Sequence, residues 1–183
     1  MARIARSDQR SFEILVRRHQ GRILNLIYRS IGDRNQAEDV AQEVFLRVWR
    51  AAEDYTPKAK FTTWIYRIAV NLCLDTVKSA HYRQSFVQIE AGVDKPDEAD
   101  RPGECEGVRS PEELLLAEEE ARRIFAALQS LPANQRLAVI LKKFDGLSYE
   151  EISRILGCSQ SAVESLLVRA KRTLRDKLLS SGS

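Results

Sequence analysis

The stretch Gly146–Leu174, "GLSYEEISRILGCSQSAVESLLVRAKRTL", predicts a short helix, a tight turn and a longer, basic helix. Ser148 with Glu151 three residues later has the spacing of a capping box, which starts the first helix. Gly157 supplies the permissive backbone that a sharp turn between two helices needs. Ser159 is expected to cap the second helix, with a rival start two residues later. This spacing is that of a helix-turn-helix.

The second helix of this pair carries polar side chains on its first turn and basic ones behind them. Its apolar positions recur every three or four residues and leave a leading face of Gln160, Ser161, Glu164 and Ser165. Gln can bind adenine and Glu can accept from cytosine. The basic residues suit phosphate contact without base reading: Arg169, Lys171, Arg172 and Arg175. A purely structural helix bundle with a solvated basic face fits the same pattern, so both readings stay open here.

Two helical segments are expected near the start of the chain. Residues 11–32, "SFEILVRRHQGRILNLIYRSIG", have apolar residues at helical spacing and end at Gly32. Residues 33–51, "DRNQAEDVAQEVFLRVWRA", follow with Asp33 as the N-cap. The inward stripe of this helix is Ala37, Val40, Ala41, Val44, Phe45 and Val48. Its other face carries Asp39, Gln42, Glu43, Leu46 and Arg50.

A third helix is expected over residues 61–83, after a loop marked by Pro57. Its apolar stripe is Phe61, Trp64, Ile65, Ile68 and Leu72. Its opposite face presents Arg67, Asn71, Asp75, Lys78 and Tyr82 at steps of three and four. Two more helices are expected in residues 111–131 and 133–144, ahead of the helix-turn-helix.

Charge and composition divide the chain into three parts. Residues 1–83 carry a net charge of +6, residues 84–134 of −7 and residues 135–183 of +4. Helical periodicity fails over 84–111, which holds most of the prolines and cannot bury enough apolar surface to order itself. The predicted fold is therefore all-α: two small helical domains, 1–83 and 112–183, joined by an acidic flexible linker, 84–111.

Several classes of protein are disfavoured by composition. We read no export signal and no apolar run of membrane-spanning length, and we expect a cytoplasmic protein without membrane insertion. Cys73, Cys105 and Cys158 are far apart, so we predict reduced thiols, no metal site and no cofactor. No Gly-rich phosphate loop or nucleophile motif is found, so an enzyme is not expected.

Four stretches together resemble the sigma factors of bacterial RNA polymerase, in their small extracytoplasmic-function (ECF) group. "DRNQAEDVAQEVFLRVW" is similar to the family's helix that binds core polymerase, and "FTTWIYRIAVNLCLDTVK" to the helix that opens the minus-ten promoter element. "LPANQRLAVILKKFDGLSYEEISRILGCS" and "SAVESLLVRAKRTL" resemble the module that binds the minus-thirty-five element. The resemblance covers nearly all of the chain outside the linker.

The resemblance implies a role for each exposed face. Asp39, Gln42, Glu43 and Leu46 would dock on the clamp helices of the largest polymerase subunit, while the polymerase flap is a further expected contact. Asn71 and Asp75 would contact a flipped base of the non-template strand, with Lys58, Lys60, Arg67 and Lys78 beside them. On the helix-turn-helix, the family often carries Thr, Lys and Arg where this chain has Ala162, Glu164 and Leu166. Phosphate anchoring would therefore fall to Arg169, Lys171 and Arg172.

The function implied is a promoter-specificity subunit that binds core polymerase and promoter DNA, helps melt the DNA and is controlled by an anti-sigma factor. Two rival functions stay open from the sequence. A stand-alone helix-turn-helix regulator would bind duplex DNA without polymerase. It would leave the helix of residues 33–51 and the helix that carries Asn71 and Asp75 without a role. A protein-interaction adaptor would use both basic parts for acidic partners and would show no dependence on DNA.

Overall fold

The computed structural model describes all residues except 1–7, 54, 57–59, 88–110 and 181–183, and for 80–87, 111–118 and 180 it describes the backbone only. Within these residues the chain forms α-helices and no strand, which confirms the all-α prediction. The helices are α1 (Gln9–Ile31), α2 (Arg34–Arg50), α3 (Phe61–Val87), α4 (Pro111–Gln129), α5 (Ala133–Lys143), α6 (Tyr149–Leu156) and α7 (Gln160–Ser180).

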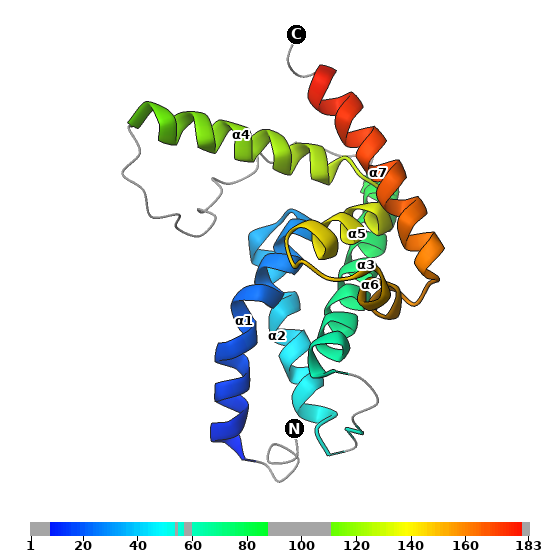
Figure 1. Cartoon of the computed structure of the whole chain (residues 1–183). Coiled ribbons are helices and arrows are strands. Elements are labelled where there is room, and N and C mark those ends of the chain that lie inside the picture. Colours follow the sequence, from blue (N-terminus) through cyan, green and yellow to red (C-terminus); the bar gives the residue numbers. More distant parts are fainter. Residues whose placement is uncertain (1–7, 54, 57–59, 88–110, 181–183) are drawn as a thin grey trace.

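Helices α1, α2 and α3 pack against one another and form the N-terminal module (Figure 1). Helix α1 ends where Gly32 adopts a left-handed backbone with φ of +90°. The side chain of Asp33 then accepts from the amide of Gln36 and caps α2, as the sequence predicts. Five of the six residues of the predicted inward stripe of α2 are buried, and Val40 is half-buried against the same core.

Helix α3 begins at Phe61 and continues to Val87, four residues beyond its predicted end at residue 83. Its buried residues include Ile65, Ala69 and Val70, on the side that faces α1 and α2. The remaining linker residues, 88–110, lie outside the described part of the chain.

Helices α4 to α7 form the C-terminal module, in which α7 packs on α4, α5 and α6. The capping box at the start of α6 is present in full: Ser148 and Glu151 each bond to the backbone of the other. Gly157 ends α6 in the left-handed conformation, with φ of +67°. Ser159 accepts from the amide of Ala162, so the cap of α7 is Ser159 rather than its rival. In Figure 1 the first part of α4 projects from the body of the molecule.

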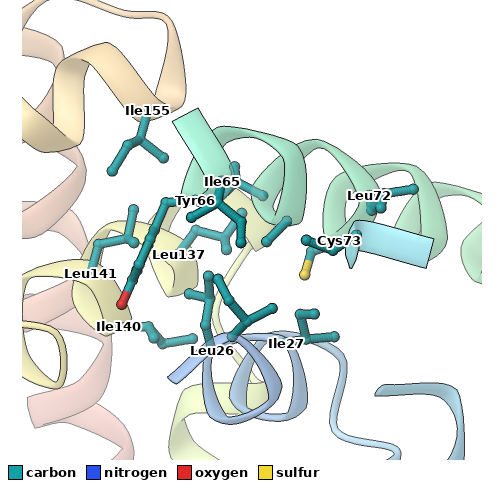
Figure 2. Packing of buried hydrophobic residues seen from close by; sticks show 14 of the residues in the cluster. Leu26, Ile27, Ile65, Tyr66, Leu72, Cys73, Leu137, Ile140, Leu141 and Ile155 are labelled. Atoms are coloured by element: carbon teal, nitrogen blue, oxygen red, sulfur yellow. The ribbon is translucent and has the colours of Figure 1, made fainter. Parts of the chain in front are cut away.

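One hydrophobic core runs through both modules. It joins Ile23, Leu26 and Ile27 of α1 and the buried stripes of α2 and α3 to Leu137, Ile140 and Leu141 of α5. Ile152, Ile155 and Val163 of the helix-turn-helix belong to the same cluster. Figure 2 shows Tyr66 reaching from α3 toward the three α5 side chains, with Leu26 on the α1 side. The sequence predicts two modules on a tether, but its periodicity does not indicate that they pack together.

Candidate nucleic-acid and polymerase interfaces

The first turn of α7 presents the predicted leading face to solvent. Val163 and Ala170 are fully buried and fix the rotation of the helix. The residues left exposed are Gln160, Ser161, Glu164 and Ser165. Ala162 and Leu166 are half-buried beside them. The first turn of α7 has no acidic residue that would offset the positive end of the helix dipole at this edge.

The basic residues that follow on α7 are also exposed: Arg169, Lys171, Arg172 and Arg175. The guanidinium Nε of Arg169 donates to the carbonyl of Ser165 at 3.2 Å, which holds the side chain along the helix toward its N-terminus. Arg175 has an exposed carboxylate neighbour, Asp176, at 3.5 Å. A positive strip therefore follows directly behind the polar leading face.

The outer face of α3 carries four exposed polar side chains in one row: Arg67, Asn71, Asp75 and Lys78. The opposite side of the same helix is buried at Ala69, Val70 and Cys73. Helical spacing of three and four residues brings the four exposed side chains onto a single surface. The side chain of Tyr82, predicted for the same row, lies outside the described residues, as does Lys58.

Lys60 stands just before α3, and its ammonium lies 3.3 Å from Oε1 of Glu151 on α6. Glu151 also accepts from the backbone amide and hydroxyl of Ser148. These two bonds, together with Lys60, lower the pKa of Glu151. One predicted DNA contact of the N-terminal module is thus ion-paired with the C-terminal module.

An aromatic cluster lies at the N-terminal end of α3. Tyr55 lies with its ring 4.8 Å from that of Trp64, and Phe61 contacts both rings. His19 of α1 packs on Phe61 at 5.3 Å, and burial with the nearby Arg18 and Arg22 lowers the pKa of His19. Phe61 and Trp64 are half-buried against the core, consistent with a packing role.

The outer face of α2 is polar with one apolar exception. Asp39 and Gln42 are exposed, and Glu43 is half-exposed and accepts from Nε of Arg47 at 2.8 Å. Leu46 is 48% exposed, although it is a large apolar side chain. Leu46 therefore adds an apolar surface to the otherwise polar outer face of α2.

Two further findings concern ligands and membranes. Across the described ranges, no group of three or more His, Cys, Asp or Glu side chains is placed to hold a metal ion. None of the helices in those ranges is long and apolar enough to cross a membrane.

Two family models match this chain: Sigma-70 region 2 over residues 15–83 and Sigma-70 region 4 over residues 121–174. The RNA polymerase sigma-H factor of Pseudomonas aeruginosa is 34% identical over 177 residues, covering 97% of this chain and 90% of that protein. The ECF RNA polymerase sigma-E factor of Escherichia coli is 32% identical over 176 residues, covering 96% and 91%.

Two solved structures share the fold of this chain. CnrH, in complex with the cytosolic domain of CnrY, is 30% identical with a TM-score of 0.66, covering all of this chain and 96% of that one. RpoE of Bartonella quintana, in complex with the anti-sigma factor NepR, has a TM-score of 0.69 over 92% of this chain and 96% of that one. At 22% identity, the likeness to RpoE concerns the fold alone. The chain belongs to the ECF sigma factors of RNA polymerase.

Proposed function

We propose that this sigma factor directs core RNA polymerase to promoters by reading the minus-thirty-five element with α7 and the minus-ten element with α3. The observation that carries the proposal is the presence of two separate exposed polar faces, one on each helix, within a chain of this family. The polymerase performs the chemistry, so the chain itself is not an enzyme. It acts in the cytoplasm, where promoter DNA lies.

For the upstream element, the first turn of α7 enters the major groove. Gln160, Ser161, Glu164 and Ser165 meet base edges, where a glutamate accepts from cytosine N4. Leu166 is half-buried beside them, and we expect it to meet a thymine methyl group. Arg169, Lys171 and Arg172 bind phosphates, which anchors the helix without selecting a sequence.

For the downstream element, the outer face of α3 binds one strand of opened DNA. Asn71 and Asp75 contact the edge of an unstacked base, because an amide and a carboxylate together offer donors and acceptors. Arg67 and Lys78 belong to the same exposed face, Lys58 and Lys60 precede it in the sequence, and we expect these cations to neutralise backbone phosphates. Lys60 must leave Glu151 to do so.

Core polymerase is the protein partner of the outer face of α2. Asp39, Gln42, Glu43 and Leu46 form a patch with an apolar centre and a polar rim, which suits the clamp helices of the largest polymerase subunit. The flap of the polymerase receives the C-terminal module. The functional units are residues 1–83 and 112–183, with 84–111 as the connector between them.

An anti-sigma factor is the second protein partner that we propose. RpoE of Bartonella quintana was solved with an anti-sigma factor, and its fold matches this chain over 92% of the length. The polymerase-binding and DNA-binding faces of this chain are both exposed, so a protein that covers them would keep the sigma factor from its partners until a signal arrives.

Transcription with sigma-free bacterial core polymerase tests the proposed function. The purified chain is mixed with core enzyme and a pool of genomic fragments, and the 5′ ends of the RNA are sequenced. We expect discrete starts that share two upstream motifs. No starts, with tight duplex binding by the chain alone, would support a stand-alone regulator. Neither starts nor DNA binding would support an adaptor.

A further inference from the structure

Polar contacts, as well as the shared core, hold the two modules together. The carbonyls of Arg29 and Ser30 belong to the last turn of α1, where backbone acceptors lack partners within the helix. The amide of Gln129 donates to the first at 2.9 Å and Arg136 donates to the second at 2.6 Å. Side chains of the C-terminal module thus complete the end of a helix in the N-terminal module.

A second contact joins α3 to the loop that precedes α6. The hydroxyl of Tyr66 donates to Oδ1 of Asp145 at 2.9 Å, and Tyr66 is 5% exposed. The guanidinium of Arg29 lies 4.4 Å from the centre of the Phe144 ring, next to Asp145. A hydrogen bond to a charged group that is shielded from water is stronger than one at the surface.

Two contacts nearer the surface complete the set. The rings of Tyr28 on α1 and Phe125 on α4 stack at 5.1 Å. Lys60 pairs with Glu151 at 3.3 Å, as described above. Together the contacts involve α1 and α3 on one side and α4, α5 and α6 on the other, so they fix the C-terminal module in one orientation.

This closed arrangement conflicts with reading both promoter elements. The minus-ten and minus-thirty-five elements lie about 25 base pairs apart, or about 85 Å along the duplex at 3.4 Å per base pair. A compact chain of 183 residues has a radius of gyration of about 16 Å, so its two reading faces cannot span that distance. Helix α6 must therefore leave α3 before both elements are bound.

Each module retains packing of its own when the two separate. In the C-terminal module, Leu128, Leu131, Val139 and Ala170 form a second cluster apart from the shared core. In the N-terminal module, Ala37, Val44 and Val48 are buried on α2, which packs against α1 and α3. Separation therefore exposes the shared surface without dismantling either module.

We propose that the contacts of Tyr66 with Asp145, Arg136 with Ser30 and Lys60 with Glu151 form an interdomain latch that keeps the free sigma factor in a closed, autoinhibited state. The latch rests on the proposed function, because closure inhibits only a protein that must reach both elements. Polymerase and promoter compete with closure, so their apparent affinity is the affinity for the open form multiplied by the fraction of molecules that are open. Residues on the reading faces need not be covered for this inhibition.

Zero-length cross-linking detects the closed state without altering the chain. A carbodiimide joins an amine and a carboxylate that are in contact, and Lys60 and Glu151 are such a pair. We expect the Lys60–Glu151 peptide in the free protein and its loss in the complex with core polymerase and promoter. Glu151→Gln removes the carboxylate and should abolish this cross-link, so loss of the peptide in this variant confirms its assignment. Absence of the cross-link in the free protein, or its full retention in the promoter complex, would overturn the proposal.

A transcription titration tests inhibition by the latch. Tyr66→Phe removes the hydroxyl that binds Asp145, and we expect it to lower the concentration for half-maximal transcription about threefold to tenfold. Tyr149→Phe removes an exposed hydroxyl from α6 and should leave that concentration unchanged. Phe144→Ala removes the ring under Arg29 at an exposed position, so it provides a second opening variant if Tyr66→Phe folds poorly.

The outcomes separate the latch from the proposed function. Wild-type transcription with unchanged half-maximal concentrations for both opening variants would refute the latch and keep the sigma function. A wild-type protein that cross-links when free but starts no RNA would refute the sigma function and, with it, the inhibitory role of closure.

Discussion

The hydroxyl of Tyr66 donates a 2.9 Å hydrogen bond to Asp145, which lies 79 residues further along the chain. The bond joins the helix that carries Asn71 and Asp75 to the loop that leads into the helix-turn-helix. The two parts that we propose read the promoter elements are therefore coupled through a polar pair in a largely apolar interface. The second carboxylate oxygen of Asp145 is buried and has no hydrogen-bond partner in the described structure.

Burial makes Asp145 sensitive to pH. It raises the pKa of this carboxyl above its ordinary range, against the opposing effects of the Tyr66 hydrogen bond and of the Arg29 and Arg22 charges. The folded protein therefore holds this proton to higher pH than the unfolded chain does. The resulting stabilisation is present below about pH 3.9 and is lost as the pH rises through the folded pKa.

Asp145→Asn removes the titrating group and leaves an acceptor for Tyr66. We expect the free energy of unfolding of this variant, relative to wild type, to increase from about pH 4 toward neutrality. Urea unfolding at a series of pH values measures the difference, and exposed Asp39→Asn controls for the loss of one negative charge. A difference that stays constant across the series would show that Asp145 does not titrate as described.

Gly32 and Gly21 make a matched pair for the end of α1. Gly32 has a φ of +90°, and a β-carbon there would lie 3.0 Å from the side chain of Gln129. Gly32→Ala should therefore destabilise the fold by about 1–2 kcal/mol. Gly21 is helical with nothing within 4 Å, and Gly21→Ala should stabilise by about 0.5–1 kcal/mol. Thermal unfolding measures both, and a neutral or stabilising Gly32→Ala would contradict the left-handed cap.

The thiol of Cys73 should react very slowly with alkylating reagents in the folded protein. Its side chain is 1% exposed, and burial raises the pKa of the thiol to about 12, so almost no thiolate is present at pH 8. We expect iodoacetamide at pH 8 to modify half-buried Cys158 well before Cys73. Peptide mass spectrometry follows both sites, with labelling in urea as the reference. Equal rates for the two cysteines in the native protein would show that α3 opens readily.

Glu164 and Arg172 test the two roles assigned to α7. Glu164→Ala in the polymerase complex should relax preference at one base pair of the upstream element by about 1–3 kcal/mol. Arg172→Ala should weaken binding to all sequences alike and reduce the salt dependence by about one phosphate contact. Fluorescence anisotropy on duplexes varied base by base measures both effects. A uniform loss for Glu164→Ala would place this side chain away from the bases.

Local features of the fold could be predicted because each depends on a few neighbouring residues. The cap at Asp33, the capping box of Ser148 with Glu151 and the turn at Gly157 all occur where the sequence predicts them. Periodicity also predicted which faces of α2 and α7 are buried. On α3 the predicted stripe was only partly right, because Ala69, Val70 and Cys73 are buried although they lie outside it. The exposed faces that carry the candidate site follow from the same pattern, because a buried stripe fixes the rotation of a helix.

The packing between the modules could not be predicted from periodicity. Tyr66 stands between Ile65 and Arg67, and nothing near it in the sequence indicates a partner in the other module. Burial of Arg136 could not be predicted either, because arginine is normally exposed and the side chain here bonds to backbone carbonyls, which every residue has. Pairs separated by 79 or 106 residues depend on the three-dimensional arrangement of the helices.

Promoter opening by wild type and by one pair of asparagine variants tests the assigned role of α3. Permanganate reacts with unpaired thymines, so it reports the opened minus-ten region in complexes of core polymerase, this sigma factor and a mapped promoter. Asn71 and Asn25 are both exposed on helices, but Asn25 lies on α1, away from the proposed DNA face. We expect Asn71→Ala to reduce thymine reactivity about tenfold, while Asn25→Ala leaves it at the wild-type level. Full reactivity with Asn71→Ala would contradict the assignment of the outer face of α3 to the opened strand.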